Sequence, residues 1–74
     1  MSAASSHDEK LVCMANQIAQ YFMSQPHDQA VAGMVDHLRS FWTPKMRRQI
    51  MDHAAVGGAG LESLTLEAVQ RLAV

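Results

Sequence analysis

Apolar residues recur at intervals of three and four along most of this chain, which is the spacing of one face of an α-helix. The polar residues between them leave no alternating run that would favour a β-strand. This pattern predicts four helical segments, each with its own apolar stripe. The stripes are Leu11, Met14, Ala15, Ile18 and Phe22; Val31, Met34, Val35, Leu38 and Trp42; Met46 and Ile50; and Leu61, Leu64, Ala68 and Leu72.

Local signals predict where the first helix begins and ends. Ser6 and Glu9 have the spacing of a capping box, in which each side chain bonds to a backbone N–H at a helix start. We therefore expect the first helix to begin near His7. Pro26 removes a backbone donor, so the helix is expected to stop soon after Ser24.

The second and third helices are expected to meet at a sharp corner. Asp28 is the expected N-cap of the second helix, which should stop at Trp42. Thr43 precedes a proline and is therefore pushed to extended geometry, where it can cap the next helix. Pro44 then takes the first position of the third helix.

A glycine-rich segment separates the last two helices. The third helix is expected to reach Ala54 or Val56, and the glycines of residues 57–60 supply the left-handed geometry of a helix end. The last helix is expected to start at Glu62 or Ser63. The predicted fold is all-α, a small bundle or orthogonal array of three to four short helices.

Residues 1–6 are predicted to form a flexible N-terminal segment and residues 7–74 a single helical domain. A chain of 74 residues buries only about 60% of the surface that its unfolded form exposes. Half of the residues (49%) are hydrophobic and six are methionines, whose side chains adapt to irregular surfaces. We therefore expect another polypeptide to cover part of the apolar surface.

The first helix illustrates this surplus of apolar surface. Val12, Ala19, Tyr21 and Met23 flank its main stripe and widen the apolar arc to about 200°, where a surface helix needs only about 100°.

Composition excludes several classes of protein. A net charge of −1 argues against a nucleic-acid-binding protein, which normally carries a strongly basic face. No run approaches the roughly 18 apolar residues of a membrane-spanning helix. The single Cys13 and the absence of a secretory pattern in residues 1–6 predict a cytoplasmic location.

The reactive side chains do not form a recognisable catalytic, cofactor or metal motif. His37 and His53 lack the partner four residues away that a zinc-binding helix carries. Cys13 has no flanking cation that would favour a thiolate. The glycines of residues 57–60 follow a helix, whereas a dinucleotide-binding loop follows a strand. We expect a chain without catalytic activity and without a cofactor or metal of its own.

Several short motifs follow one another along the chain: MANQIA at 14–19, YF at 21–22, AVAG at 30–33, HL at 37–38, FWTPKMR at 41–47 and GGAGL at 57–61. Taken together, over about residues 10–72, they resemble the delta subunit of NAD-dependent formate dehydrogenases. The resemblance implies a subunit of a soluble complex that oxidises formate to carbon dioxide with NAD. In that family the large subunits hold a molybdenum or tungsten pterin, iron–sulfur clusters and flavin mononucleotide. The delta subunit binds none of these and supports assembly or activity, so its expected partners are the large subunits.

Four basic residues cluster at the corner between the second and third helices: Arg39, Lys45, Arg47 and Arg48. The last three lie in the first turns of a helix, where the dipole disfavours cations. They are candidates for contact with an acidic patch on a partner subunit. The alternative is a solvated basic surface without a partner.

Four further residues are candidates for partner binding. Trp42 is either a core residue or an interface anchor, and Phe41, about 100° away on the same helix, is the better interface candidate. Asn16 and Gln17 lie off the main apolar stripe and offer amides either to another chain or to solvent. Gly33 marks a close approach to a helix of this domain or of the partner.

A second function class remains open at the level of sequence. The second and third helices have the order of a helix-turn-helix, in which Arg47 and Arg48 would contact phosphates. The chain would then be a free-standing helical adaptor or nucleic-acid-binding module. A salt-dependent gel shift would favour this alternative, and co-purification with large flavin- and molybdenum-containing subunits would favour the first function.

Overall fold

A computed structural model describes the backbone of residues 3–73 and the side chains of residues 8–73. Within this part of the chain every regular element is an α-helix, so the predicted all-α fold is confirmed. The helices are α1 (Ala3–Phe22), α2 (His27–Phe41), α3 (Pro44–Ala55) and α4 (Ser63–Leu72). None of these helices is both long enough and apolar enough to pass through a bilayer.

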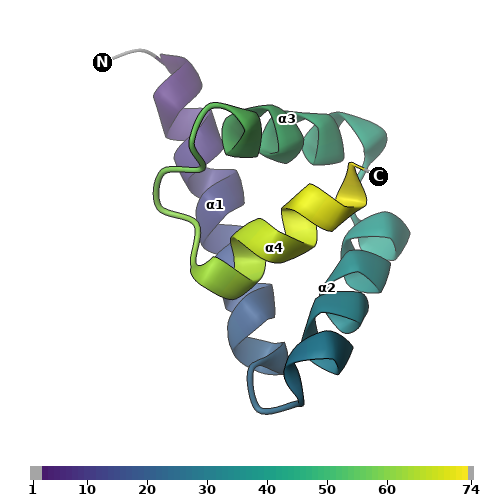
Figure 1. Cartoon of the computed structure of the whole chain (residues 1–74). Helices are drawn as coiled ribbons and strands as arrows, with labels where there is room; N and C mark the ends of the chain where they lie inside the picture. Colours follow the sequence, from purple (N-terminus) through teal and green to yellow (C-terminus); the bar gives the residue numbers. More distant parts are fainter. Residues whose placement is uncertain (1–2, 74) are drawn as a thin grey trace.

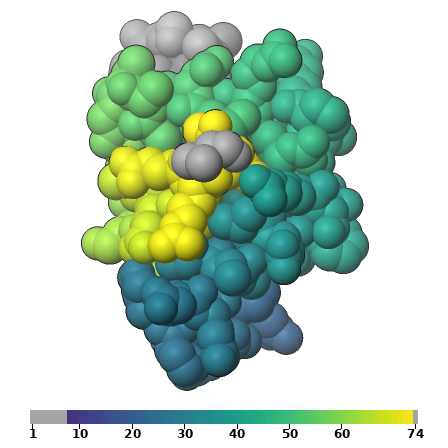
Figure 2. Space-filling model, turned by 45° about the vertical axis from the view of Figure 1, so that its right-hand side comes forward, coloured from purple at the N-terminus to yellow at the C-terminus, as the bar shows by residue number. Residues whose placement is uncertain are grey.

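The four helices form an angular array (Figure 1). α1 and α2 are joined by the turn at residues 23–26 and diverge from it as the two arms of a V. α3 crosses the open end of the V, and α4 lies against all three other helices. In Figure 2 the yellow side chains of α4 fill the space between α3 and α2 on one face of the molecule.

The core lies where the four helices meet, and the largest fully buried side chains come from three of them. Each helix contributes the side of its surface that faces this centre. The largest fully buried side chains are those of Val31, Met34, Leu38, Ile50, Thr65 and Val69. The predicted stripe of α2 is confirmed, because all five of its residues are buried.

α1 begins earlier than the sequence predicted. Its first residue is Ala3, whereas the capping-box interpretation placed the start near His7. Alanines at positions 3 and 4 are the strongest helix formers, and they extend the helix toward the N-terminus. Ser6 therefore lies inside the helix and is not its N-cap, although its side chain lies outside the described part. The flexibility of residues 1–6 stays a prediction, as does the domain boundary at residue 7.

The start of α2 also differs from the prediction. Pro26 is the N-cap, and its carbonyl oxygen accepts the first helical hydrogen bond from the Ala30 N–H at 2.9 Å. Asp28 lies within the first turn and makes no capping hydrogen bond. Its negative charge still favours the helix there, because the N-terminal end of the dipole is positive.

The start of α3 is as predicted. Thr43 has extended geometry, its hydroxyl accepts a hydrogen bond from the Met46 N–H at 3.1 Å, and Pro44 follows as the first helical residue. The helix ends at Ala55, within the expected range. Three glycines of residues 57–60 have positive φ angles, as their sequence positions indicated.

The buried face of α4 agrees with the prediction in part and extends to two further residues. Leu61 and Leu64 are only half-buried, whereas Thr65 and Val69 are buried together with the expected Ala68 and Leu72. Thr65 is fully inaccessible and is the one polar residue in the core of the described chain. A polar side chain can occupy such a position only when its hydroxyl has a hydrogen-bond partner.

Gly33 marks a close approach within this domain. A Cβ atom on Gly33 would lie 2.5 Å from the ring of Phe22, so the ring of α1 rests directly on the backbone of α2. Of the two alternatives that the sequence left open, the structure shows contact with a helix of the same chain. Gly33 thus holds the two arms of the V together near their junction.

Candidate functional site

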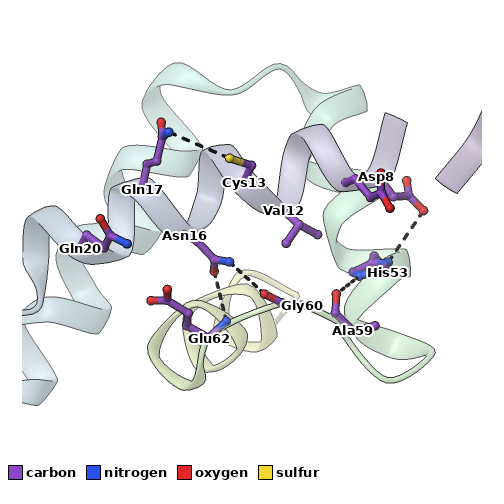
Figure 3. A pocket seen from close by; sticks show the side chains of 11 residues that line it. Asp8, Val12, Cys13, Asn16, Gln17, Gln20, His53, Ala59, Gly60 and Glu62 are labelled. Atoms are coloured by element: carbon purple, nitrogen blue, oxygen red, sulfur yellow. Dashed lines mark hydrogen bonds and ion pairs between the residues drawn. The ribbon is translucent and has the colours of Figure 1, made fainter. Parts of the chain in front are cut away.

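The amide of Asn16 connects α1 to the start of α4 (Figure 3). Its nitrogen donates a hydrogen bond to the Gly60 carbonyl oxygen at 2.9 Å. Its oxygen accepts two more, from the Glu62 backbone N–H at 3.1 Å and from the Thr65 hydroxyl at 2.8 Å. Glu62 is the N-cap of α4 and makes no capping bond with its own side chain. Asn16, which lies on α1, therefore supplies the hydrogen-bond acceptor that the start of α4 lacks in its own side chains.

A polar groove of about 840 Å³ lies beside this connection, between α1 and the 57–62 turn. His53 lines it and donates a hydrogen bond from Nε2 to the Ala59 carbonyl oxygen at 2.7 Å. The other ring nitrogen lies 3.8 Å from the Asp8 carboxylate. His53, on α3, thus connects this helix to the glycine-rich turn through Ala59 and to α1 through Asp8.

The basic corner divides into one internal residue and three surface residues. The Arg47 guanidinium turns back toward the C-terminal end of α2 and donates hydrogen bonds to three carbonyl oxygens there: those of Leu38, Arg39 and Trp42. These carbonyl oxygens form the negative end of the α2 dipole. A cation near the start of α3 is unfavourable for the dipole of α3. Arg47 is nevertheless accounted for, because its guanidinium stabilises the end of the preceding helix, α2.

Replacing Arg47 with glutamine is expected to lower the free energy of unfolding by about 1–2 kcal/mol, because charged hydrogen bonds to the last carbonyl groups of α2 are lost. The control is Arg48→Gln, which removes the same charge from an exposed position one residue away. That change is expected to stay within about 0.5 kcal/mol. Urea denaturation followed by circular dichroism measures both, and equal losses would contradict the capping role.

The other three basic residues do not share one surface. Arg39 lies in a groove between α2 and α4, next to Glu67 and Arg71. Lys45 and Arg48 are exposed on the outer side of α3. The single basic patch expected from the sequence is therefore divided between separate faces of the molecule.

The two adjacent aromatic residues at the end of α2 have opposite environments. Trp42 is 6% exposed and belongs to the core, whereas Phe41 is 74% exposed. The Phe41 ring lies 4.7 Å, centroid to centroid, from that of His37. Because Phe41 is exposed and Trp42 is not, Phe41 remains the better candidate for contact with a partner.

An apolar groove runs between α1 and α2, on the side of α2 away from α4. Met14, Ile18 and Tyr21 line it from α1, and His37 and Trp42 from α2. We call this surface, with Phe41 at its rim, the α1–α2 groove. Tyr21 was expected to widen the apolar arc of α1, and it is 77% exposed here. Gln17 is exposed and borders both this groove and the polar groove.

Comparison with known families identifies the family to which most of the chain is similar. Residues 10–69 match the family described as "NADH-dependant formate dehydrogenase delta subunit FdsD". The chain belongs to this family. No curated protein and no solved structure matches it. The match spans α2, α3 and the 57–62 turn, together with most of α1 and α4.

Side chains that could ligate metals are scattered over the surface of this FdsD-family chain. Among the described residues, no three His, Cys, Asp or Glu side chains lie close enough to hold a metal ion. His27 pairs with Glu67 at 2.7 Å, His53 lies between Ala59 and Asp8, and Cys13 is an exposed free thiol.

Sequence analysis missed the internal roles of Asn16 and Arg47. Both were interpreted as surface groups because helical periodicity places them off the apolar stripes. The signal that identifies Asn16 is the lack of a capping side chain at the start of α4, which leaves backbone donors that need a partner from elsewhere. The signal for Arg47 is the end of α2, whose last carbonyl groups lie five to nine residues earlier in the chain. Whether any of the eight candidates contacts a partner stays a prediction.

Proposed function

We propose that this chain is a non-catalytic accessory subunit of a cytoplasmic formate dehydrogenase, which binds the larger, cofactor-bearing subunits and supports their assembly, stability or activity. Membership of the FdsD family, across residues 10–69, carries the proposal. The larger subunits are the proposed partners, and the chemistry of formate oxidation is assigned to them. The delta subunit itself is proposed to bind neither a cofactor nor a metal.

The distribution of apolar side chains supports a binding role. Among residues 8–73, four large hydrophobic side chains are exposed: Tyr21, Met23, Phe41 and Val56. Tyr21 lines the α1–α2 groove, and Phe41 lies at its rim. Trp42 forms part of the floor of this groove. Contiguous exposed apolar surface on a small protein is typical of a surface that another polypeptide covers.

The helix-turn-helix alternative loses one of its two proposed phosphate contacts. Arg47 already donates to the carbonyl groups at the end of α2, so its guanidinium does not project from the corner. Of these two arginines, only Arg48 is exposed. Lys45 is exposed near it, and two cations give only weak electrostatic attraction to a nucleic-acid backbone.

Co-expression with and without this chain tests the proposal. A tag on one of the larger subunits should recover the chain in a fixed ratio to the other subunits. Omitting the chain should lower the yield of assembled, formate-oxidising enzyme, and adding the purified chain back should restore part of it. Recovery of the larger subunits without the chain, together with full assembly and activity in its absence, would contradict the proposal.

A further inference from the structure

We infer that the corner between α2 and α3 binds an acidic surface of one of the larger subunits. Five exposed residues form this surface, which we call the α2–α3 corner: Phe41, Thr43, Pro44, Lys45 and Arg48. The inference rests on the proposed function, and it adds the surface of this chain and the charge of its partner. The observations that carry it are the environment of the two cations, the fixed backbone of the corner and its exposed aromatic ring.

The fold of this chain does not account for the two cations of the corner. Lys45 and Arg48 are exposed and three residues apart, so they share one face of α3. Among residues 8–73 neither forms an ion pair, and Asp52, one turn beyond Arg48, does not pair with it. The first turn of α3 contains no acidic residue, and the positive end of its dipole disfavours cations, most strongly at Lys45. Carboxylates of another chain would offset this repulsion.

The backbone of the corner is fixed before any partner binds. The guanidinium of Arg47 donates hydrogen bonds to three carbonyl oxygens at the end of α2. The Thr43 hydroxyl accepts a hydrogen bond from the Met46 N–H, and Trp42 is buried between these two anchors. A surface whose backbone is already fixed loses little conformational entropy when it binds.

Phe41 provides an apolar contact next to the charges. It is the last residue of α2 and is 74% exposed, and the exposed Pro44 follows three residues later. Aromatic residues and arginine are enriched at the centres of protein interfaces. Two surface cations alone contribute little affinity, so Phe41, which also lies at the rim of the α1–α2 groove, is expected to supply most of the binding energy. The cations then select an acidic partner.

Carboxylates elsewhere on the molecule favour one orientation of such a partner. Asp8, Glu9 and Glu62 line the polar groove, which lies near the end of α3, whereas the corner lies at its start. α3 has 12 residues, so the two surfaces are separated by a helix about 18 Å long. An acidic surface is attracted to the corner and repelled by the polar groove.

The test uses the assembled complex, with a tag on a larger subunit, and measures how tightly each version of the chain is retained. Lys45→Gln combined with Arg48→Gln neutralises the corner. The matched control, Arg39→Gln combined with Arg71→Gln, removes the same two charges from the groove between α2 and α4. These two arginines lie in the last turns of α2 and α4, where cations favour the helix.

The two double variants are expected to change binding and stability in opposite ways. The corner variant should bind at least about tenfold more weakly than the natural chain, while its urea midpoint as a free chain is equal or higher. The control should bind normally and have a lower urea midpoint. Association of the natural chain should weaken as salt rises, and this dependence should be much smaller for the corner variant.

Phe41→Ser tests the apolar part of the corner and is also expected to lower affinity at least about tenfold. Its control is Val56→Ser, because Val56 is 83% exposed at the opposite end of α3. Natural affinity in the neutralised corner variant, or equal losses in that variant and the arginine control, would overturn the inference. So would binding of duplex DNA by the free natural chain that the corner variant loses. If the larger subunits do not retain the natural chain, the proposed function fails together with the corner.

Discussion

Replacing Trp42 with alanine is expected to lower the free energy of unfolding by about 3–5 kcal/mol. Trp42 is 6% exposed and packs in the core beside the junction of α2 and α3. Removing its indole ring leaves a cavity that the surrounding helices cannot fill without leaving their contacts. Domains of this size have a total stability of only about 5–10 kcal/mol, so much of it would be lost.

Phe41→Ala is the matched control, because it truncates the neighbouring aromatic side chain on the same helix. Phe41 is exposed, and its loss is expected to change stability by less than about 0.5 kcal/mol. Urea denaturation followed by far-ultraviolet circular dichroism compares the two variants without relying on tryptophan fluorescence. Similar losses for both would contradict the assignment of Trp42 to the core and Phe41 to the surface.

Asn16→Ala is expected to lower the free energy of unfolding by about 2–4 kcal/mol. Three hydrogen bonds would be lost, each with a net contribution of about 0.5–1.5 kcal/mol. The Thr65 hydroxyl would also remain buried without its partner, which adds a desolvation penalty. The α3–α4 turn and the first turn of α4 are expected to lose protection from amide hydrogen exchange before the rest of the chain.

Gln17→Ala provides the control for this change, because it removes an amide from the next residue of α1 where the side chain is exposed. Its expected effect is below about 0.5 kcal/mol. A second test adds Thr65→Val to Asn16→Ala, which removes the buried hydroxyl. The double variant should recover part of the stability that Asn16→Ala loses. No recovery, or an effect of Gln17→Ala equal to that of Asn16→Ala, would contradict the proposed connection.

Most of the fold could be predicted from local patterns. The stripe from Val31 to Trp42 has strict helical spacing, and all its residues are buried. Thr43 and Pro44 combine two strong local preferences, so the corner between α2 and α3 was predicted to the residue. These features depend on residues within a few positions of each other, and their signals are contained in short segments of sequence.

The errors arose where distant parts of the chain interact. Leu61 and Leu64 have the right spacing for the buried face of α4 but are only half-buried, and Thr65, which donates a hydrogen bond to Asn16, is fully buried in the core. The partners of this bond are 49 residues apart, and periodicity within one helix contains no information about it. The same limitation applies to Arg47, whose role depends on how α3 is placed relative to the end of α2.

The candidate partner-binding residues were predicted by type but not by location. The arginine cluster forms one patch in the sequence, whereas the structure separates Arg39 from Arg48 and uses Arg47 internally. Phe41 was expected to be a better interface candidate than Trp42, and it is exposed where Trp42 is buried; its contact with a partner stays a prediction.

Hydroxyl-radical footprinting of the chain, alone and within the assembled formate dehydrogenase, measures directly whether the larger subunits cover the α1–α2 groove. In the free chain Tyr21, Phe41 and Val56 are all exposed and should be oxidised. In the complex, oxidation of Tyr21 and Phe41 is expected to fall several-fold while Val56 stays reactive. Unchanged oxidation of Tyr21 and Phe41 in a complex that retains the chain would contradict binding through this groove.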